Sequence, residues 1–509
     1  MKKSVIILCF LSSLVITATA QVQTWEEKME AMRQRVQMKM ENQQRRVDLQ
    51  FANQVRRMWL NMQFIEGEAA PEIPEPSIPK VYDPAIRIPK DQQEMRVIPD
   101  LNLPSDEGIA ATPDLRVNPE PEPPASPPDP KMEADVNQMD REVRLAYFGK
   151  QMALHYDSGM EFGMPGTLNT NAIADEWEKL EKTPYEFLVY QLSRQARDLK
   201  LNDWGFALLV NEMAKQIYPN DKNARTLFNW FILTKAGYIA TVSYESNQMY
   251  LMLPSKNVLY GKSYLQGKDN KLYAIDLDGG NPELLRAKVF QAQHPEAKKV
   301  MDFQLKSAPL FTGQSRKKTV NFSYAGKSYT VPLEVNTHLV DFYETYPFVD
   351  LDIYMSAPLS APAHASMVVA LQEIVKNMPV RPDQNREAEG VNLILRFVQT
   401  AFAYKPDNEQ FGQERYLFGD ETLYYPYSDC EDRAVLFAHL VKEIMGLEVV
   451  GLLFPGHAAT AVKFTSDVPG DFIRYQNKKY VICDPTYINA DLGMVLPDVE
   501  GQSAKIVAL

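Results

Sequence analysis

The sequence predicts an α+β protein made of two similar globular halves, preceded by a long helix and a proline-rich linker. Three observations support this prediction. Helix-like and strand-like apolar patterns follow residue 140, in the same order twice. Apolar residues between residues 25 and 65 recur at helical spacing. Sixteen of the 35 prolines lie between residues 71 and 130, a composition typical of an extended spacer without a core.

The first twenty residues have the features of a cleavable export signal. Lys2 and Lys3 precede a mostly apolar run, and residues 18–20, Ala-Thr-Ala, have the small-x-small form that signal peptidase cuts. Cys9 lies inside the apolar run rather than at its end, which argues against a lipid anchor. We therefore expect residues 1–20 to be removed. The mature protein is then expected to be periplasmic or extracellular, without a transmembrane segment.

Residues 21–70 are expected to form one amphipathic helix. Apolar residues from Trp25 to Ile65 follow helical spacing, with Arg and Glu between them. Its polar face is not one-sidedly basic, which argues against a membrane-surface helix. Such a helix packs on its own domain or on a second copy, so residues 24–66 are a candidate surface for self-association or for a protein partner. Residues 71–139 then form the linker.

The sequence predicts that the globular part consists of two copies of one unit, residues 140–300 and residues 315–509. Each copy begins with a hairpin pattern, continues with two helical stretches, and ends with a buried helix followed by strands. An unrelated α+β domain with coincidental matches is the alternative for the first copy. The segments that match are residues 221–225 with 429–433, and residues 271–276 with 479–484.

Three residues of the second copy, Cys430, His457 and Asp484, are candidates for a catalytic triad. Cys430 lies at the start of an apolar helix, within a Ser-x-x-Glu string of capping-box form. A thiol there faces unpaired backbone N–H groups and the positive end of the helix dipole, which lower its pKa. We expect the acids that flank it to cap the helix or to face solvent. His457 and Asp484 lie at strand ends, where an imidazole could take the thiol proton and a carboxylate could orient the imidazole.

At these residues the sequence resembles the transglutaminase-like superfamily, a papain-related group of Cys-His-Asp enzymes. The resemblance covers about residues 367–487 and implies a nucleophile-bearing helix packed on an antiparallel sheet. It also implies an acyl-thioester intermediate formed from an amide or peptide carbonyl, with Cys430 as nucleophile, His457 as base and then acid, and Asp484 as orienting carboxylate. Glu431 stands where animal transglutaminases have tryptophan. The sequence therefore looks more like the bacterial, often hydrolytic branch, which argues against calcium-dependent cross-linking.

In the first copy, the triad positions hold Lys222, Gln248 and Asp276. Lysine does not replace a thiolate without a base, and glutamine takes no proton at neutral pH. We therefore expect this copy to be inactive and to act as a binding or positioning module.

The predicted function is an exported thiol amidase, peptidase or acyltransferase that acts on a peptide, protein or cell-wall amide. The alternative is a non-catalytic exported scaffold in which Cys430 is an inert buried thiol and His457 a core histidine. A disulfide between Cys430 and Cys483 is a further alternative. Strand alternation argues against it, because Cys483 and Asp484 point to opposite faces.

Two classes of partner are not expected. The net charge is −12, with 66 acidic against 54 basic residues, which argues against nucleic acid because counterion release requires clustered Lys and Arg. No Cys-x-x-Cys or His-Glu-x-x-His spacing occurs, so no metal and no other cofactor is predicted.

Overall fold

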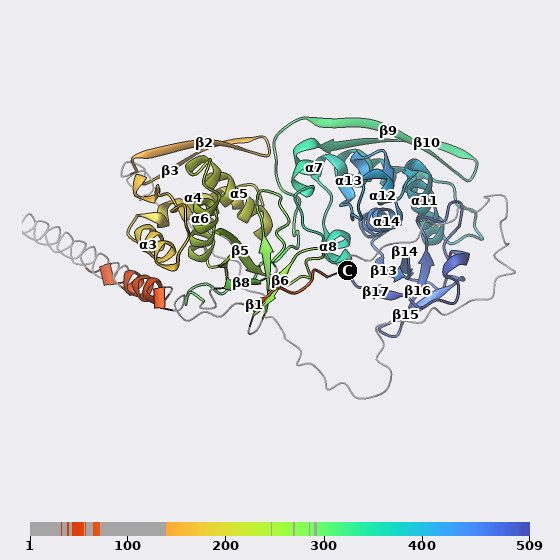
Figure 1. Ribbon diagram of the computed structural model, residues 1–509. Helices are drawn as coiled ribbons and strands as arrows, with labels where there is room; N and C mark the ends of the chain where they lie inside the picture. Colours follow the sequence, from red (N-terminus) through yellow and green to blue (C-terminus); the bar gives the residue numbers. More distant parts are fainter. Residues whose placement is uncertain are drawn as a thin grey trace, which may run out of the picture.

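The computed structural model describes residue 32, residues 38–39, 43–54, 56–57 and 65–71, and residues 139–509 apart from 246, 268–269, 285 and 290–292. The expected signal peptide and nearly all of the expected linker lie outside the described residues. The described chain combines helices with antiparallel sheets, as predicted for an α+β protein, and its two halves lie side by side (Figure 1).

Residues 43–54 form a helix that packs on the first half. Phe51 is buried, and its ring centroid lies 5.4 Å from that of Trp177. Ile65 belongs to strand β1 (Ile65–Glu66), which pairs with strand β8. The prediction of one helix over residues 21–70 is therefore wrong at its end. The physical reason is that an extended backbone at residues 65–66 can pair with β8 at the edge of the sheet. In a helix, the same backbone groups would bond within the helix and could not pair with a strand.

The first half places four helices between a hairpin and a sheet. The hairpin consists of β2 (Arg141–Tyr147) and β3 (Lys150–Tyr156). The helices are α3 (Thr170–Glu181), α4 (Tyr185–Asp198), α5 (Asp203–Ile217) and α6 (Lys222–Lys235). The strands are β4 (Thr241–Glu245), β5 (Gln248–Pro254), β6 (Tyr264–Gln266), β7 (Lys271–Ile275) and β8 (Arg286–Val289), in the order β1-β8-β4-β5-β7-β6.

The second half begins with a longer hairpin, β9 (Ser315–Tyr324) and β10 (Lys327–Asn336). The helices that follow are α7 (Thr337–Tyr343), α8 (Leu351–Ser356), α9 (Ala361–Ala363), which continues through η3 (His364–Val368) into α10 (Val369–Asn377), then α11 (Arg386–Ala401), α12 (Asp407–Gln410), α13 (Gly419–Tyr424) and α14 (Cys430–Met445). Two short strands, β11 (Ala403–Tyr404) and β12 (Tyr427–Ser428), pair in parallel. The main sheet has β13 (Glu448–Phe454), β14 (His457–Lys463), β15 (Phe472–Tyr475), β16 (Lys478–Cys483) and β17 (Lys505–Val507).

The main sheets of the two halves have the same strand order. Apart from the additional edge strand β1, the first sheet runs β8-β4-β5-β7-β6. The second sheet runs β17-β13-β14-β16-β15, and each of these pairings is antiparallel. In both halves the buried helix comes directly before the sheet in the chain, and α6 packs on β5 as α14 packs on β14. In Figure 1 the two hairpins lie along one side, the sheets along the other, and the helices between them.

Helix α14 is buried on nearly every side. Residues 434–438 are all buried, which is typical of a helix in the middle of a core rather than at its surface. The helix ends at Gly446, whose φ of 66° lies in the left-handed region where glycine is favoured. This end fixes where β13 begins.

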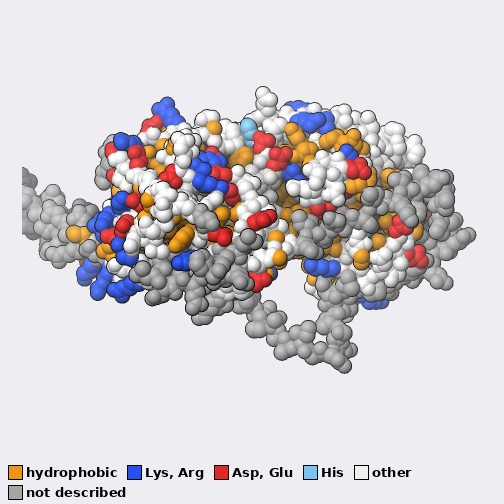
Figure 2. All heavy atoms as spheres, viewed as in Figure 1, with side chains coloured by type: hydrophobic (Ala, Val, Ile, Leu, Met, Phe, Trp, Pro, Cys, Tyr) orange, Lys and Arg blue, Asp and Glu red, His pale blue; other side chains and the backbone are white. Residues whose placement is uncertain are grey.

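The two halves share one apolar core. Phe342 of α7 is fully buried, and its ring centroid lies 5.5 Å from that of Phe148 in the first hairpin. Trp204 of α5 donates from Nε1 to Thr345 Oγ1 at 3.1 Å. On the face shown in Figure 2, acidic and basic side chains are interspersed over the first half. None of the helices that the structure describes has both the length and the apolar character that a membrane crossing requires.

Candidate active site

His457 and Asp484 form a buried hydrogen-bonded pair. His457 is the first residue of β14, reached through a tight turn at Gly456, and Asp484 follows β16 directly. The imidazole Nε2 lies 2.8 Å from Asp484 Oδ2, and both side chains are almost fully buried. Asp484 Oδ1 accepts the backbone N–H groups of Thr486 and Tyr487 at 2.9 and 3.0 Å. These bonds hold the carboxylate in the orientation that fixes the imidazole.

The second nitrogen of His457, Nδ1, is buried and has no hydrogen-bond partner among the described residues. A buried ring nitrogen in this state is available to a group that approaches it. The residue after His457, Ala458, packs against Cys430 and Ala434. Cys430 therefore packs beside the residue that follows His457 in β14.

Cys430 is the first residue of α14, and its side chain is fully buried. Its thiol donates to Glu431 Oε2 at 3.0 Å. No hydrogen bond joins Cys430 to His457 among the described contacts. The structure thus shows the pair His457–Asp484 and packs Cys430 against Ala458, the residue after His457, while the thiol donates to a carboxylate that was not assigned from the sequence.

Three expectations about the start of α14 are wrong. The helix is capped by Asp429, with Asp432 at the third position, rather than by the predicted Ser-x-x-Glu string, and Asp432 Oδ2 accepts the Asp429 N–H at 3.2 Å. The pKa of the Cys430 thiol is raised rather than lowered, because burial disfavours the thiolate and the carboxylates of Glu431 and Asp429 repel it. Glu431 neither caps the helix nor faces solvent. Burial and like-charge repulsion outweigh the helix dipole here.

Access to Cys430 is closed in this conformation. A cleft of about 900 Å³ lies between the halves, lined by residues that include Trp204 and Lys262 of the first half and Tyr346 and Tyr416 of the second. None of the three candidate residues lines it. A substrate would reach the sulfur only after side chains around the start of α14 move.

Cys430 and Cys483 do not form a disulfide. Cys430 belongs to the small apolar cluster at the start of β14, whereas Cys483 lies in the main core. The structure therefore agrees with the strand-alternation argument against a disulfide.

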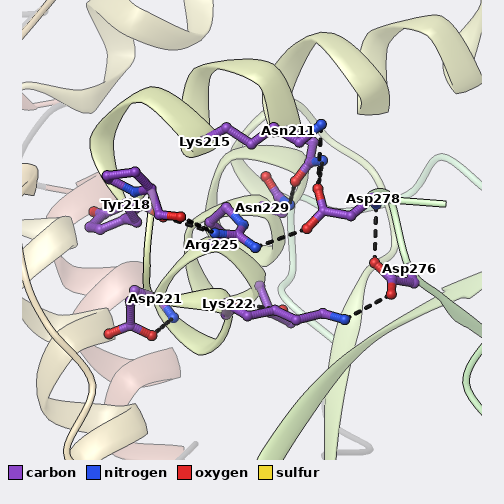
Figure 3. Close-up of polar contacts among 12 residues, drawn as sticks. Asn211, Lys215, Tyr218, Asp221, Lys222, Arg225, Asn229, Asp276 and Asp278 are labelled. Carbon is purple, nitrogen blue, oxygen red and sulfur yellow. Dashed lines mark hydrogen bonds and ion pairs between the residues drawn. The ribbon is translucent and has the colours of Figure 1, made fainter. Parts of the chain in front are cut away.

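The first half has an ion pair at the positions that correspond to the triad. Lys222 is the first residue of α6, Gln248 the first of β5, and Asp276 follows β7 directly. Lys222 Nζ lies 2.8 Å from Asp276 Oδ2 (Figure 3). A lysine paired with this carboxylate has no free lone pair for nucleophilic attack. That the first copy is inactive stays a prediction.

A further match between the halves was not predicted. Arg225, in the first turn of α6, donates to the carbonyl of Tyr218, the residue that ends α5 (Figure 3). Arg433, in the first turn of α14, donates to the carbonyl of Phe402, the residue that ends α11, at 2.8 Å. A bond of the same kind thus ties each buried helix to the residue that follows an earlier helix, α5 in the first half and α11 in the second.

Comparison with models of protein families, with curated proteins and with solved structures gave no match. Sequence reasoning did not find Glu431 as the thiol's partner, nor Gln399, whose side chain donates to the carbonyl of Asp484 at 3.0 Å. Glu431 belongs to the same Ser-x-x-Glu string as Cys430. The inward orientation of the Glu431 side chain depends on how other segments pack around the start of α14. No sequence pattern indicates it.

Proposed function

We propose that the protein is a cysteine-dependent hydrolase of the transglutaminase-like type, acting on an amide or peptide bond after an opening of the helix start. The observation that carries the proposal is the buried His457–Asp484 pair at 2.8 Å, with the second imidazole nitrogen unpartnered beside the residue that contacts Cys430. An imidazole oriented by a carboxylate and available on its other side is what a thiol nucleophile requires. The papain-like core and export belong to the same proposal.

The chemistry proceeds in two steps. His457 Nδ1 takes the thiol proton as the Cys430 sulfur attacks the carbonyl carbon, and the imidazolium then gives that proton to the departing amine, which leaves a thioester. Water attacks the thioester with His457 as base, releasing the carboxylic acid and restoring the thiol. Asp484 stabilises the imidazolium in both steps. An amine in place of water would give transfer instead of hydrolysis.

Our first prediction concerns the dependence of the thiol on His457. With the full chain at neutral pH, site-resolved mass spectrometry should show iodoacetamide labelling of Cys430 that falls at least tenfold in His457→Ala, because the thiol loses its base. Release of free amine from a peptide mixture should be abolished in Cys430→Ala and nearly abolished in His457→Ala. The matched control is Cys483→Ser, which changes an equally buried thiol of the core and should leave most of the activity.

The competing hypothesis is a non-catalytic scaffold. In that case Cys430 would label no faster than Cys483, and His457→Ala would not change its rate. Equal loss of activity in Cys430→Ala and Cys483→Ser, with folding intact, would also contradict the triad assignment.

A further inference from the structure

The cleft between the two halves is built from separate segments of each. The wall from the first half includes Tyr260, Lys262 and residues 276–281, which follow β7. The wall from the second half includes residues 343–348, at the end of α7 and beyond it, and residues 413–416, which come before α13. Its volume of about 900 Å³ lies at the upper end of the range for clefts that hold a drug-sized ligand. The cleft therefore has room for a short segment of peptide.

Hydrogen bonds hold both walls in place. In the second wall, the backbone N–H of Arg415 donates to Asp407 Oδ2 at 2.8 Å. In the first wall, the side-chain amide of Asn281 donates to the carbonyl of Gly261 at 3.0 Å. The cleft is therefore formed before any ligand binds, which lowers the conformational entropy that binding costs.

Aromatic rings line both walls. Phe148 and Tyr260 come from the first half, Tyr346 and Phe348 come from the second, and all four side chains are partly exposed. The ring centroid of Phe348 lies 5.6 Å from that of Tyr260 and 4.4 Å from that of Tyr416. Rings of the two halves are thus in contact within the cleft. Such rings offer apolar surface to a ligand and attract cations to their faces.

Acidic side chains outnumber basic ones in the lining. Six carboxyl groups line the cleft against three Lys or Arg side chains, namely Glu212, Asp276, Asp278, Asp341, Glu344 and Glu414 against Lys215, Lys262 and Arg415. In the first wall, Asp276 pairs with Lys222 at 2.8 Å (Figure 3). Asp278 pairs with Arg225 at 2.9 Å. The negative charge of the first wall is therefore largely balanced within that half.

In the second wall, two acids form no ion pair with a Lys or Arg among the described residues. Asp341 Oδ2 lies 3.1 Å from His338 Nδ1, and Glu344 accepts the hydroxyl of Tyr425. Both acids are exposed, so their charge can reach a ligand in the cleft. Figure 2 shows acidic side chains at the junction of the two halves.

The basic side chains of the lining do not offset this charge. Arg415 pairs with Glu421, which does not line the cleft. Lys215 pairs with Glu212 at 2.6 Å. Lys262 belongs to the first wall. The second wall therefore attracts cations, and a cleft concentrates that field.

We propose that this cleft binds an extended peptide segment that carries Lys or Arg side chains. The charged end of such a side chain would pair with the carboxylates of the second wall, while its apolar stem and its charge lie against the aromatic rings. An acidic peptide would meet an excess of carboxylates. A purely apolar ligand would displace water from them without supplying a counterion. The charge of the cleft therefore selects a basic peptide.

This inference goes beyond the proposed function and does not depend on it. None of Cys430, His457 and Asp484 lines the cleft, so the basic side chain bound there is not the group that reacts at the thiol. Because one wall comes from the first half, the site would give that copy the binding role expected from the sequence.

The test measures peptide binding to the full chain by titration calorimetry. The chain carries Cys430→Ala, so that no peptide is consumed during the titration. The capped peptide Gly-Arg-Phe-Arg-Gly should bind at one site at least tenfold more tightly than Gly-Gln-Phe-Gln-Gly, and Gly-Glu-Phe-Glu-Gly should bind more weakly still. Raising the salt concentration from about 50 to about 500 mM should weaken only the arginine peptide, because salt screens charge pairs. Hydrogen exchange in residues 343–348 and 413–416 should become slower when the arginine peptide binds.

Two variants test the second wall and the lysine of the first. Asp341→Asn combined with Glu344→Gln should weaken binding of the arginine peptide at least fivefold and leave the glutamine peptide unchanged. Lys262→Gln should tighten binding of the arginine peptide, because it removes a like charge, an effect that a merely structural role does not produce. The matched control is Asp175→Asn combined with Glu178→Gln, which removes the same two charges from α3, away from the junction of the halves (Figure 1), and should leave the affinity unchanged.

The proposal is overturned if the arginine and glutamine peptides bind equally well, if the double variant of the second wall binds the arginine peptide as tightly as its parent, or if the protected residues lie outside the two walls. Tightest binding of the glutamate peptide would show instead that Lys262 makes the cleft a site for an anionic ligand, and would also overturn it. Thermal unfolding checks that each variant is folded. No turnover is measured, so a failure here leaves the hydrolase proposal to its own test.

Discussion

At the scale of single residues, the carboxyl group of Glu431 is the hydrogen-bond partner of the Cys430 thiol. The thiol donates to it at 3.0 Å, an arrangement that stabilises the protonated sulfur. The pKa of Glu431 is itself raised, first by burial and then by repulsion from Asp429. A helix start favours a thiolate only while its dipole is the main local charge. With several buried carboxyl groups close by, the balance is reversed, and the resting thiol is protonated at neutral pH.

His439 of α14 makes stability depend on pH. Burial lowers its pKa to about 4; the attraction of Glu443 opposes this, and Lys442 and His364 lower it further. The folded protein therefore disfavours the charged imidazole, whereas the unfolded chain binds the proton at about pH 6.5. Stability from the neutral histidine is present above pH 6.5 and is lost as the pH falls towards 4.

We predict that the parent loses about 3 kcal/mol more free energy of unfolding between pH 6.5 and 4 than His439→Gln does. Urea unfolding at graded pH measures this difference. The control is His155→Gln, at a half-buried position of β3. Equal slopes for the parent and His439→Gln would show that the buried imidazole is not responsible.

The candidate residues could be predicted from the sequence, but their local chemistry could not. The positions of Cys430, His457 and Asp484 follow from patterns that mark a helix start and two strand ends, and such patterns are local. Whether Glu431 points to the sulfur or to solvent depends on the packing of segments far apart in the chain. For the same reason, no spacing in the sequence indicated that Asp407 and Asp429 lie together.

At the scale of elements, a buried ion network attaches the N-terminal helix to the first half. Asp48 Oδ1 lies 2.7 Å from Lys235 Nζ and 3.1 Å from His294 Nε2, and Asp48 Oδ2 accepts the Tyr185 hydroxyl at 3.1 Å. Lys235 also pairs with Glu181 at 2.8 Å. This face of the helix is used within the chain, as expected for a helix that packs on its own domain. Self-association through residues 24–66 stays a prediction.

Asp48→Ala should release this helix. The change leaves Lys235 and His294 buried with fewer partners, at a cost of about 3 kcal/mol. Hydrogen exchange of residues 43–54 should become faster, while the second half is unaffected under native conditions. The control is Arg56→Ala, whose exposed ion pairs with Asp175 and Glu178 contribute at most about 1 kcal/mol. Unchanged exchange in Asp48→Ala would mean that the apolar contacts of Phe51 suffice to hold the helix.

At the scale of the whole molecule, the two halves repeat one architecture with different chemistry. The shared strand order, the matching positions of Lys222 and Cys430, and the equivalent bonds of Arg225 and Arg433 all support a duplication. The repeated order of elements was predicted from the sequence, because each element has its own apolar period. The way in which the halves pack was not, since it depends on side chains such as Phe342 whose partners lie far along the chain.

Because the core is continuous between the halves, we predict that they unfold together. Phe342→Ala should lower the free energy of unfolding by about 3–5 kcal/mol, because it removes a fully buried ring at the junction of the halves and leaves a cavity there. Phe231→Ala, which removes an equally buried ring inside the first half, is the matched change. Calorimetry should show both variants moving one shared transition. Two transitions, with Phe231→Ala moving only one of them, would show that the junction is too weak to couple the halves, and that the first half positions its partner without stabilising it.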